Sequence, residues 1–89
     1  MNAQLSEPDT DKVIGIIAEQ LDVKRDQVTP EARIMDDLGA DSLDIVEITI
    51  KLEERFNVTI PDEEWDKVQT VGELQTALAE FLQPAAASQ

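Results

Sequence analysis

Residues 38–44, of sequence LGADSLD, place one serine, Ser42, between two aspartates, Asp41 and Asp44, directly before an apolar segment. A serine here can be a helix cap, a catalytic nucleophile or a point of covalent attachment. A serine–histidine–aspartate relay is excluded, because the chain has no histidine to act as the base. The chain also has no cysteine, and therefore no thiolate nucleophile and no disulfide. Thiol or imidazole chemistry at this site must come from another molecule.

Helix capping explains part of this segment. The side-chain oxygen of either Asp41 or Ser42 can accept a backbone N–H of the first helical turn, and the sequence leaves open which one does. Capping does not explain the small residues Gly39 and Ala40, which would allow another protein to approach closely. An attached phosphodiester on Ser42 has a physical rationale, because the start of a helix favours an anion by about 0.3–1 kcal/mol. The neighbouring Asp41 and Asp44 oppose this effect and suit a basic partner instead.

Composition and charge restrict the class of protein. The chain has 89 residues, enough for one domain, and only three aromatic residues, so we expect a mainly aliphatic core in a helical bundle. Seven basic residues against 20 acidic ones give a net charge of −13, which disfavours nucleic acid and anionic lipid and attracts basic protein surfaces. Without an apolar run of about 20 residues or a basic-then-apolar start, we expect no membrane insertion and a cytoplasmic monomer.

Apolar residues recur at helical spacing in three segments. The first ends at Leu21, and the second covers 42–56. The second has so wide an apolar arc that we expect a central helix with neighbours on more than one side. The third begins at Thr70, has Glu73 three residues later as a capping box, and is ended by Pro84.

These segments predict an all-α protein, a small four-helix bundle with three longer helices and one short third helix. A long loop, 22–40, separates helices one and two, and a loop of this length in a small domain is often functional. The short third helix follows an extended segment, 58–60, and Pro61. The expected domain organisation is a flexible N-terminus over 1–8, one folded domain over 9–83 and a disordered tail over 84–89.

Two longer stretches, DDLGADSLDIVEI and KLEERFNVTIPDEEWDKVQTV, resemble the freestanding acyl carrier proteins of bacterial and organellar fatty-acid synthesis. The resemblance extends from about Val13 to Leu82. The tripeptide DSL alone would be a weak signal, but DSL joined to FNVTIPDEE at this separation is specific to the family.

The resemblance implies a carrier rather than an enzyme. Ser42 would be the attachment site of 4′-phosphopantetheine, transferred from coenzyme A by a phosphopantetheinyl transferase, and the thiol of that group would hold acyl intermediates as thioesters. Acyltransferases, ketosynthases and other synthase enzymes with basic surfaces are the further implied partners. They would dock on the exposed side of helix 42–56, with apolar contacts from Leu43 and Ile50. The acidic residues of this face are Asp41, Asp44, Glu47, Glu53 and Glu54.

The resemblance also implies an acyl pocket between helices two and three and the bundle interior. Burial of an acyl chain there would gain about 0.8 kcal/mol per methylene. The matching positions, each of which could equally be ordinary core, are Ile34, Val46, Ile48, Leu52, Ile60, Val68 and Leu74.

Three positions depart from the family's usual pattern. Lys51 replaces a small apolar residue, Thr49 replaces an aliphatic one, and Trp65 replaces a small residue in the short third helix, where it could cover the bundle or narrow the pocket entrance. These changes leave open a dedicated carrier for a specialised lipid, polyketide or other acyl product.

Other classes of protein also remain open. Peptidyl carrier domains share the architecture, but their serine usually follows Gly-Gly-His or a similar stretch rather than Gly-Ala-Asp. A calcium-binding domain is suggested by Asp36, Asp37, Asp41 and Asp44, although their spacing does not match the D-x-[DN]-x-[DN]-G loop. An acidic adaptor with an unmodified Ser42 would have the same helices and charge.

Overall fold

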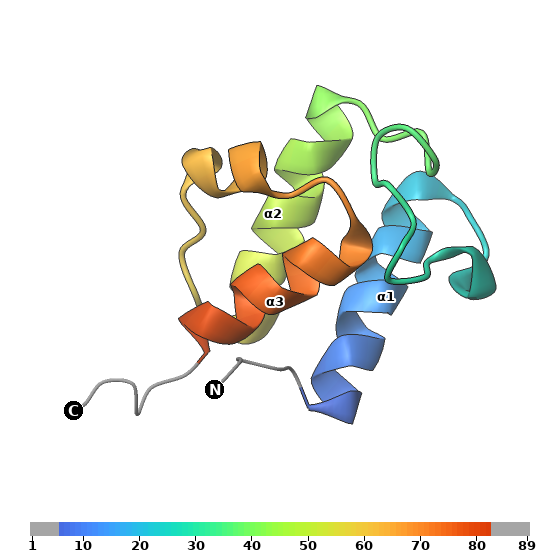
Figure 1. Ribbon diagram of the computed structural model, residues 1–89. Coiled ribbons are helices and arrows are strands. Elements are labelled where there is room, and N and C mark those ends of the chain that lie inside the picture. The colour runs from blue at the N-terminus through green and yellow to red at the C-terminus, as the bar shows by residue number, and fades with distance from the viewer. Residues whose placement is uncertain (1–5, 83–89) are drawn as a thin grey trace.

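A computed structural model describes residues 6–82 (Figure 1). Within these residues the regular elements are all helices, and there is no strand. The elements are α1 (Glu7–Leu21), η1 (Arg25–Gln27), α2 (Ser42–Phe56), η2 (Asp62–Lys67) and α3 (Val71–Phe81), where η denotes a 3-10 helix. The predicted all-α fold is confirmed, with η2 as the short third helix. The one element that the sequence did not predict is η1, a single turn within the long loop. No helix within residues 6–82 could span a lipid bilayer.

Helix α1 begins at Glu7, before the expected start of the folded domain at residue 9. The Ser6 side chain accepts the backbone N–H of Asp9 at 3.3 Å and caps the helix. Pro8 lies in the first turn, where its missing N–H costs no helical hydrogen bond. Pro8 is therefore part of the fold and not of the expected flexible segment. The residues before Ser6 and the whole of the expected tail lie outside the described residues.

The core is aliphatic and is contributed by the helices and by the long loop. Helices α1 and α2 pack against each other, and α3 crosses α2 (Figure 1). The loop is anchored by Val28, Ile34 and Leu38, all of which are buried. The largest fully buried side chains are Val13, Ile17, Ile34, Ile48, Leu52, Val71 and Leu78. The loop is thus a packed part of the domain that fixes the position of the chain entering α2.

The wide apolar arc of α2 contacts neighbours on more than one side, as expected, but part of it is exposed. Ile48 and Leu52 are fully buried, but Leu43, Val46 and Ile50 are 65%, 52% and 47% exposed. Part of the arc therefore forms an apolar strip on the surface instead of contacting a second layer of helices. This exposed strip begins beside Ser42, the first residue of α2.

Candidate attachment site

The start of α2 settles which residue caps the helix. Asp41 is the N-cap, and its Oδ1 accepts the backbone N–H of Asp44 at 2.9 Å. Asp44 completes a capping box, because its Oδ2 accepts the backbone N–H of Asp41 at 3.2 Å. Asp41 and Asp44 therefore satisfy the helix terminus between them.

Ser42 is left with an available hydroxyl. It is the first residue of α2 and is exposed, and its side chain has no hydrogen-bond partner within residues 6–82. The first-turn N–H groups favour an attached phosphate, but the carboxylates of Asp41 and Asp44 on either side of Ser42 oppose it, so the accessibility of the hydroxyl is the stronger argument. An external enzyme can reach this hydroxyl without unfolding any part of the domain, so the site fits a covalently attached phosphodiester.

The small residues before Ser42 serve the loop's own structure. Gly39 has a φ of 79°, in the left-handed region that glycine adopts without strain. Ala40 is only 6% exposed and packs with the core. The interpretation that both residues admit a partner's surface is wrong for Ala40, because the protein's own core already covers it.

The four aspartates that suggested a calcium site have separate structural roles. Asp36 forms an ion pair with Arg33 at 3.5 Å, and Asp37 Oδ2 accepts the backbone N–H of Arg33 at 2.9 Å. Asp41 and Asp44 form the capping box. Among residues 6–82 no three acidic side chains converge as metal ligands. These contacts explain the aspartates without a metal.

A groove of about 630 Å³ opens beside Ser42. It lies between the start of α2, the loop around Met35, and η2 with the residues that follow it. Three of the seven positions predicted for the acyl pocket line it: Ile34, Val46 and Val68. Val46 lies at the open side, since half of its surface is exposed. The remaining lining residues are Arg33, Met35, Asp36, Ile45, Asp62, Trp65, Asp66 and Gln69.

The other predicted pocket positions lie deeper. Ile60 and Leu74, with Val68, line a second space of only about 10 Å³ between η2 and α3. Ile48 and Leu52 line neither space and are fully buried in the core. The structure therefore divides the predicted pocket into an open groove, a nearly filled inner space and solid core.

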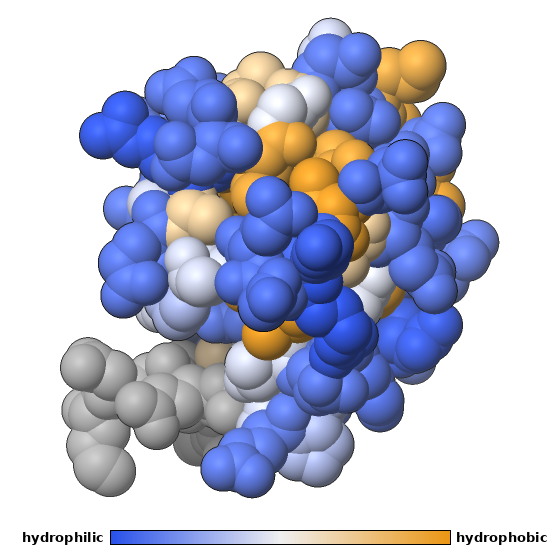
Figure 2. All heavy atoms as spheres, turned by 90° about the vertical axis from the view of Figure 1, so that its right-hand side faces the viewer, coloured by the Kyte–Doolittle hydropathy of each residue, from blue (hydrophilic) through white to orange (hydrophobic). Residues whose placement is uncertain are grey.

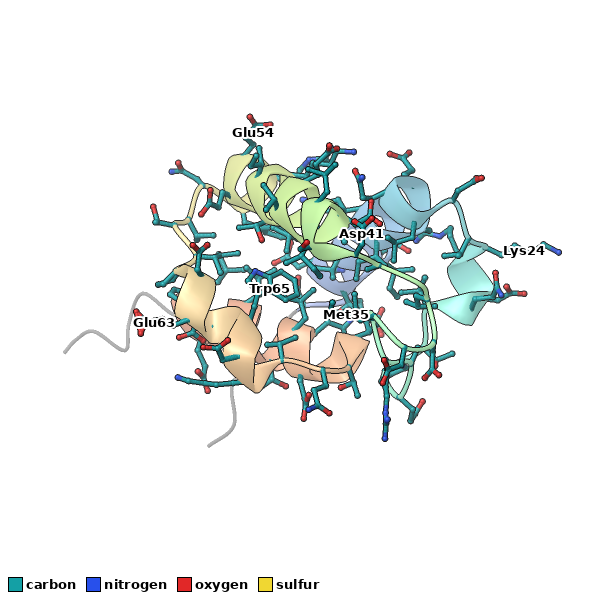
Figure 3. All side chains as sticks on the ribbon, turned by 90° about the horizontal axis from the view of Figure 1, so that it is seen from above. Lys24, Met35, Asp41, Glu54, Glu63 and Trp65 are labelled. Carbon is teal, nitrogen blue, oxygen red and sulfur yellow. The ribbon has the colours of Figure 1, made fainter. Side chains whose placement is uncertain are left out.

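The predicted docking face is also divided. Leu43, Glu47, Ile50 and Glu54 are exposed on α2, and Glu54 points away from the bundle in Figure 3. The remaining acids have contacts within the chain. Asp44 is half-buried, and its Oδ1 also accepts a hydrogen bond of 3.2 Å from Gln20 Nε2. Glu53 is half-buried as well, and its Oε2 accepts a hydrogen bond of 2.8 Å from the backbone N–H of Ile60.

Residues 11–78 match the family described as "Phosphopantetheine attachment site". The chain belongs to this family. An "Acyl carrier protein" of Syntrophobacter fumaroxidans is 52% identical over 68 residues, 76% of this chain and 84% of the relative. An "Acyl carrier protein" of Helicobacter pylori is 57% identical over 60 residues, 67% of this chain and 77% of the relative. A solved acyl carrier protein from Enterococcus faecalis superposes with a TM-score of 0.72 and 37% identity, covering 84% of this chain and 95% of that one.

These relatives confirm the resemblance to freestanding acyl carrier proteins that the sequence indicated. As a member of the phosphopantetheine attachment family, the chain carries covalently bound 4′-phosphopantetheine. When bound, this group supplies the thiol that the chain lacks and holds acyl groups as thioesters.

Sequence reasoning about this family member missed two features of the groove. Met35 is 54% exposed and lines the groove, but a lone apolar residue in a loop gave no periodic signal. Thr49 and Trp65 were noted as separate departures from the family pattern. In the structure they touch, because Trp65 Nε1–H donates a hydrogen bond of 2.8 Å to Thr49 Oγ1.

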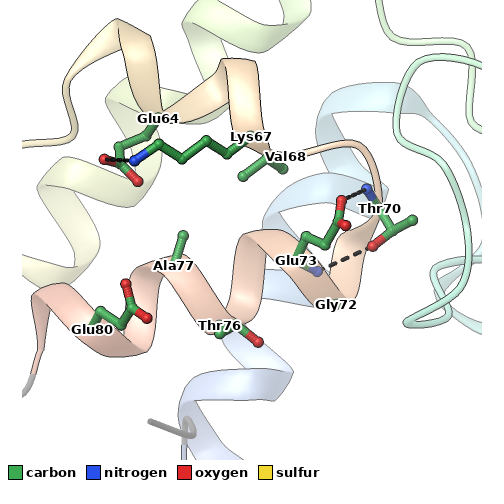
Figure 4. A pocket seen from close by; sticks show the side chains of 9 residues that line it. All are labelled: Glu64, Lys67, Val68, Thr70, Gly72, Glu73, Thr76, Ala77 and Glu80. Carbon is green, nitrogen blue, oxygen red and sulfur yellow. Dashed lines mark hydrogen bonds and ion pairs between the residues drawn. The ribbon is translucent and has the colours of Figure 1, made fainter. Parts of the chain in front are cut away.

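A further surface hollow, of about 590 Å³, lies between η2 and α3 and does not include Ser42 (Figure 4). Glu64 and Lys67 form an ion pair of 3.6 Å across its upper side. Thr70 and Glu73 form the capping box of α3 at its end, as the sequence predicted. These four side chains are engaged in pairs, and the hollow does not include the start of α2, where Ser42 lies.

Proposed function

We propose that this family member is an acyl carrier protein whose 4′-phosphopantetheine is attached to Ser42 Oγ. It carries acyl intermediates between enzymes of fatty-acid synthesis or a related lipid or polyketide pathway. The observation that supports Ser42 most directly is its exposed hydroxyl, which the neighbouring Asp41 leaves free by capping the helix itself. The groove beside Ser42 supports an apolar cargo, because Ile34, Val46 and Val68 line it.

The chain takes part in its own modification as a substrate. Ser42 Oγ attacks the pyrophosphate of coenzyme A, a phosphodiester forms at the oxygen, and the adenosine bisphosphate leaves. The proton of the hydroxyl goes to a base of the phosphopantetheinyl transferase, because this chain has no histidine and no side chain within residues 6–82 hydrogen-bonds Ser42. The carrier is therefore not itself an enzyme.

Synthase partners with basic surfaces dock on α2. Leu43 and Ile50 provide apolar contact, and Glu47 and Glu54 provide exposed charge with no competing ion pair among the described residues. Asp41, Asp44 and Glu53 add to the negative field of this face while their carboxylates hold the fold together. Acyltransferases and ketosynthases are the expected partners. We place the carrier in the cytoplasm. It acts as a monomer, because a net charge of −13 keeps its copies apart.

The test is modification in vitro. The purified chain is incubated with coenzyme A and a phosphopantetheinyl transferase, and intact mass is measured. We expect one added phosphopantetheine on the native chain and on the matched control Ser6→Ala, which changes another serine. We expect none on Ser42→Ala. Modification of Ser42→Ala, or failure of the native chain when a second carrier is modified in the same tube, would refute the proposal.

A further inference from the structure

Trp65 lies at the boundary between the two spaces of the predicted acyl pocket. It lines the open groove beside Ser42 and also the small inner space between η2 and α3. Val68 is the one other residue that lines both. The inner space, at about 10 Å³, is close to the minimum that holds a single water molecule. An acyl chain in the groove therefore meets Trp65 and Val68 before it reaches the interior.

A hydrogen bond fixes Trp65 in this position. The indole extends from η2 toward α2 (Figure 3), and its N–H donates to Thr49 Oγ1 at 2.8 Å. The Thr49 hydroxyl in turn donates to the backbone carbonyl of Ile45 at 2.8 Å, so its orientation is set by its own helix. Both hydrogen bonds are partly buried. Moving the indole aside would break this part-buried hydrogen bond, which is unfavourable.

We propose that Trp65, held by Thr49, is the end wall of the acyl groove and makes this chain selective for short acyl groups. This inference rests on the proposed function, because it requires an acyl chain carried beside Ser42. Short chains lie in the groove against Met35 and Val46, whose exposed apolar side chains contact them. Long chains extend past the wall into solvent instead of entering the space between η2 and α3.

The alternative role for Trp65 is to cover the bundle without affecting cargo. In that case its removal would lower stability and leave the behaviour of acyl chains unchanged. The two roles are separable because thioester protection and folding stability are independent measurements. Trp65 is also the single tryptophan of the chain, so intrinsic fluorescence reports on this side chain alone.

The experiment uses the holo-protein loaded with butanoyl, octanoyl or hexadecanoyl groups. The rate of thioester cleavage by hydroxylamine is measured for each, together with tryptophan emission. For the native chain we expect equal cleavage rates for octanoyl and hexadecanoyl groups, and the same tryptophan emission spectrum with these two groups, because both chains end against or pass the same wall. In Trp65→Ala we expect slower cleavage of the hexadecanoyl thioester than of the octanoyl one. The cleavage rate should fall by up to roughly fourfold for each additional methylene that is buried.

Variants of Thr49 provide a matched pair that keeps the tryptophan. Thr49→Ser retains the hydroxyl and should behave as the native chain. Thr49→Val retains the shape without the acceptor, and should protect the hexadecanoyl thioester to an intermediate degree and alter its tryptophan emission. This pair also tests the proposal if Trp65→Ala does not fold.

Three results would overturn the end wall. One is that hydroxylamine already cleaves the hexadecanoyl thioester of the native chain more slowly than the octanoyl thioester. Another is a shift of native tryptophan emission when the octanoyl group is replaced by the hexadecanoyl group. The third is identical chain-length dependence in Thr49→Val and Thr49→Ser. Each requires an acylated holo-protein, so each contradicts the end wall while the carrier function stands. Failure to form the holo-protein at all would instead contradict the attachment at Ser42.

Discussion

At the scale of single residues, the site depends on a division of roles between neighbours. Asp41 and Ser42 are both residue types that cap helices, so the sequence could not decide between them. The deciding factor is where the helix begins: Asp41 has an extended backbone with φ of −106°, and Ser42 is already helical. The sequence predicted which residue is modified. That its hydroxyl is not used for capping could be seen only once the structure showed at which residue the helix begins.

The capping and charge roles of Asp41 can be separated by substitution. Asp41→Ala removes both the side-chain acceptor and the charge, and should lower the free energy of unfolding by about 1 kcal/mol. Asp41→Asn keeps an acceptor oxygen, so its stability should stay near that of the native chain. Its modification by a phosphopantetheinyl transferase should nevertheless slow severalfold, because a charge beside Ser42 is lost. Urea unfolding and initial modification rates measure the two effects.

Glu54→Gln is the control for a remote charge on the same helix. It should leave stability unchanged and slow modification less than Asp41→Asn does, because Glu54 is exposed near the other end of α2. Equal modification rates for Asp41→Asn and the native chain would show that Asp41 acts only as a cap.

At the scale of elements, helical periodicity predicted α1, α2 and α3 well, because each places apolar residues on one face. It could not predict η1, because three residues are too few to show a periodic pattern of apolar residues. Nor could it show which part of the apolar arc of α2 faces solvent. Val46 and Ile48 are equally apolar, and only the positions of α1, η2 and the loop decide that Ile48 is buried and Val46 is not.

The junction between η2 and α3 is held by one carboxylate. Glu73 Oε1 accepts the backbone N–H of Gln69 at 2.7 Å and of Thr70 at 3.1 Å. These hydrogen bonds favour the ionised form, so they lower the pKa of Glu73 below its ordinary value of 4.5, with Gln69 as the larger cause. A carboxyl group whose pKa is lower in the folded state stabilises the fold above its unfolded pKa, and this stabilisation is lost as the pH falls through the folded pKa.

Glu73→Gln should therefore be less stable than the native chain at neutral pH. Because the substituted amide cannot ionise, the difference should shrink as the pH falls below about 4.5, through the lowered pKa of Glu73. Thermal unfolding of both chains from neutral pH to the acid range measures this difference. Glu80→Gln, at an exposed position late in α3, is the control and should show no comparable trend. A difference that stays constant with pH would contradict the role of the ionised carboxylate.

At the scale of the whole molecule, charge opposes folding and favours binding. The net charge is −13, and the ion pairs within residues 6–82 involve only Asp9, Asp11, Asp36 and Glu64 among the acids. Hydrophilic residues cover most of the face shown in Figure 2, where apolar side chains appear between them. The composition predicted this imbalance directly, because charge is a sum over residues. Which acids of α2 face solvent, namely Glu47 and Glu54, depended on knowing which side of that helix is exposed.

Salt should therefore change stability and partner recognition in opposite directions. Sodium chloride shortens the Debye length from about 10 Å at 0.1 M to about 3 Å at 1 M. Repulsion within the chain then weakens, and the melting temperature should rise by about 4–8 °C for each kcal/mol of repulsion removed. The same screening weakens attraction to a basic partner, so modification of Ser42 by a transferase should slow over the same range.

The charge reversal Glu47→Lys tests whether α2 is the origin of both effects. Glu47 is exposed beside Leu43 and Ile50 on the docking face, so the substitution should lower the modification rate at low salt and flatten its salt dependence. It should also raise the melting temperature at low salt, because it removes two units of negative charge. A matched reversal away from α2, Glu31→Lys, makes the same change in net charge at an exposed loop position. If both variants slowed modification equally, recognition would depend on net charge alone and α2 would not be the docking face.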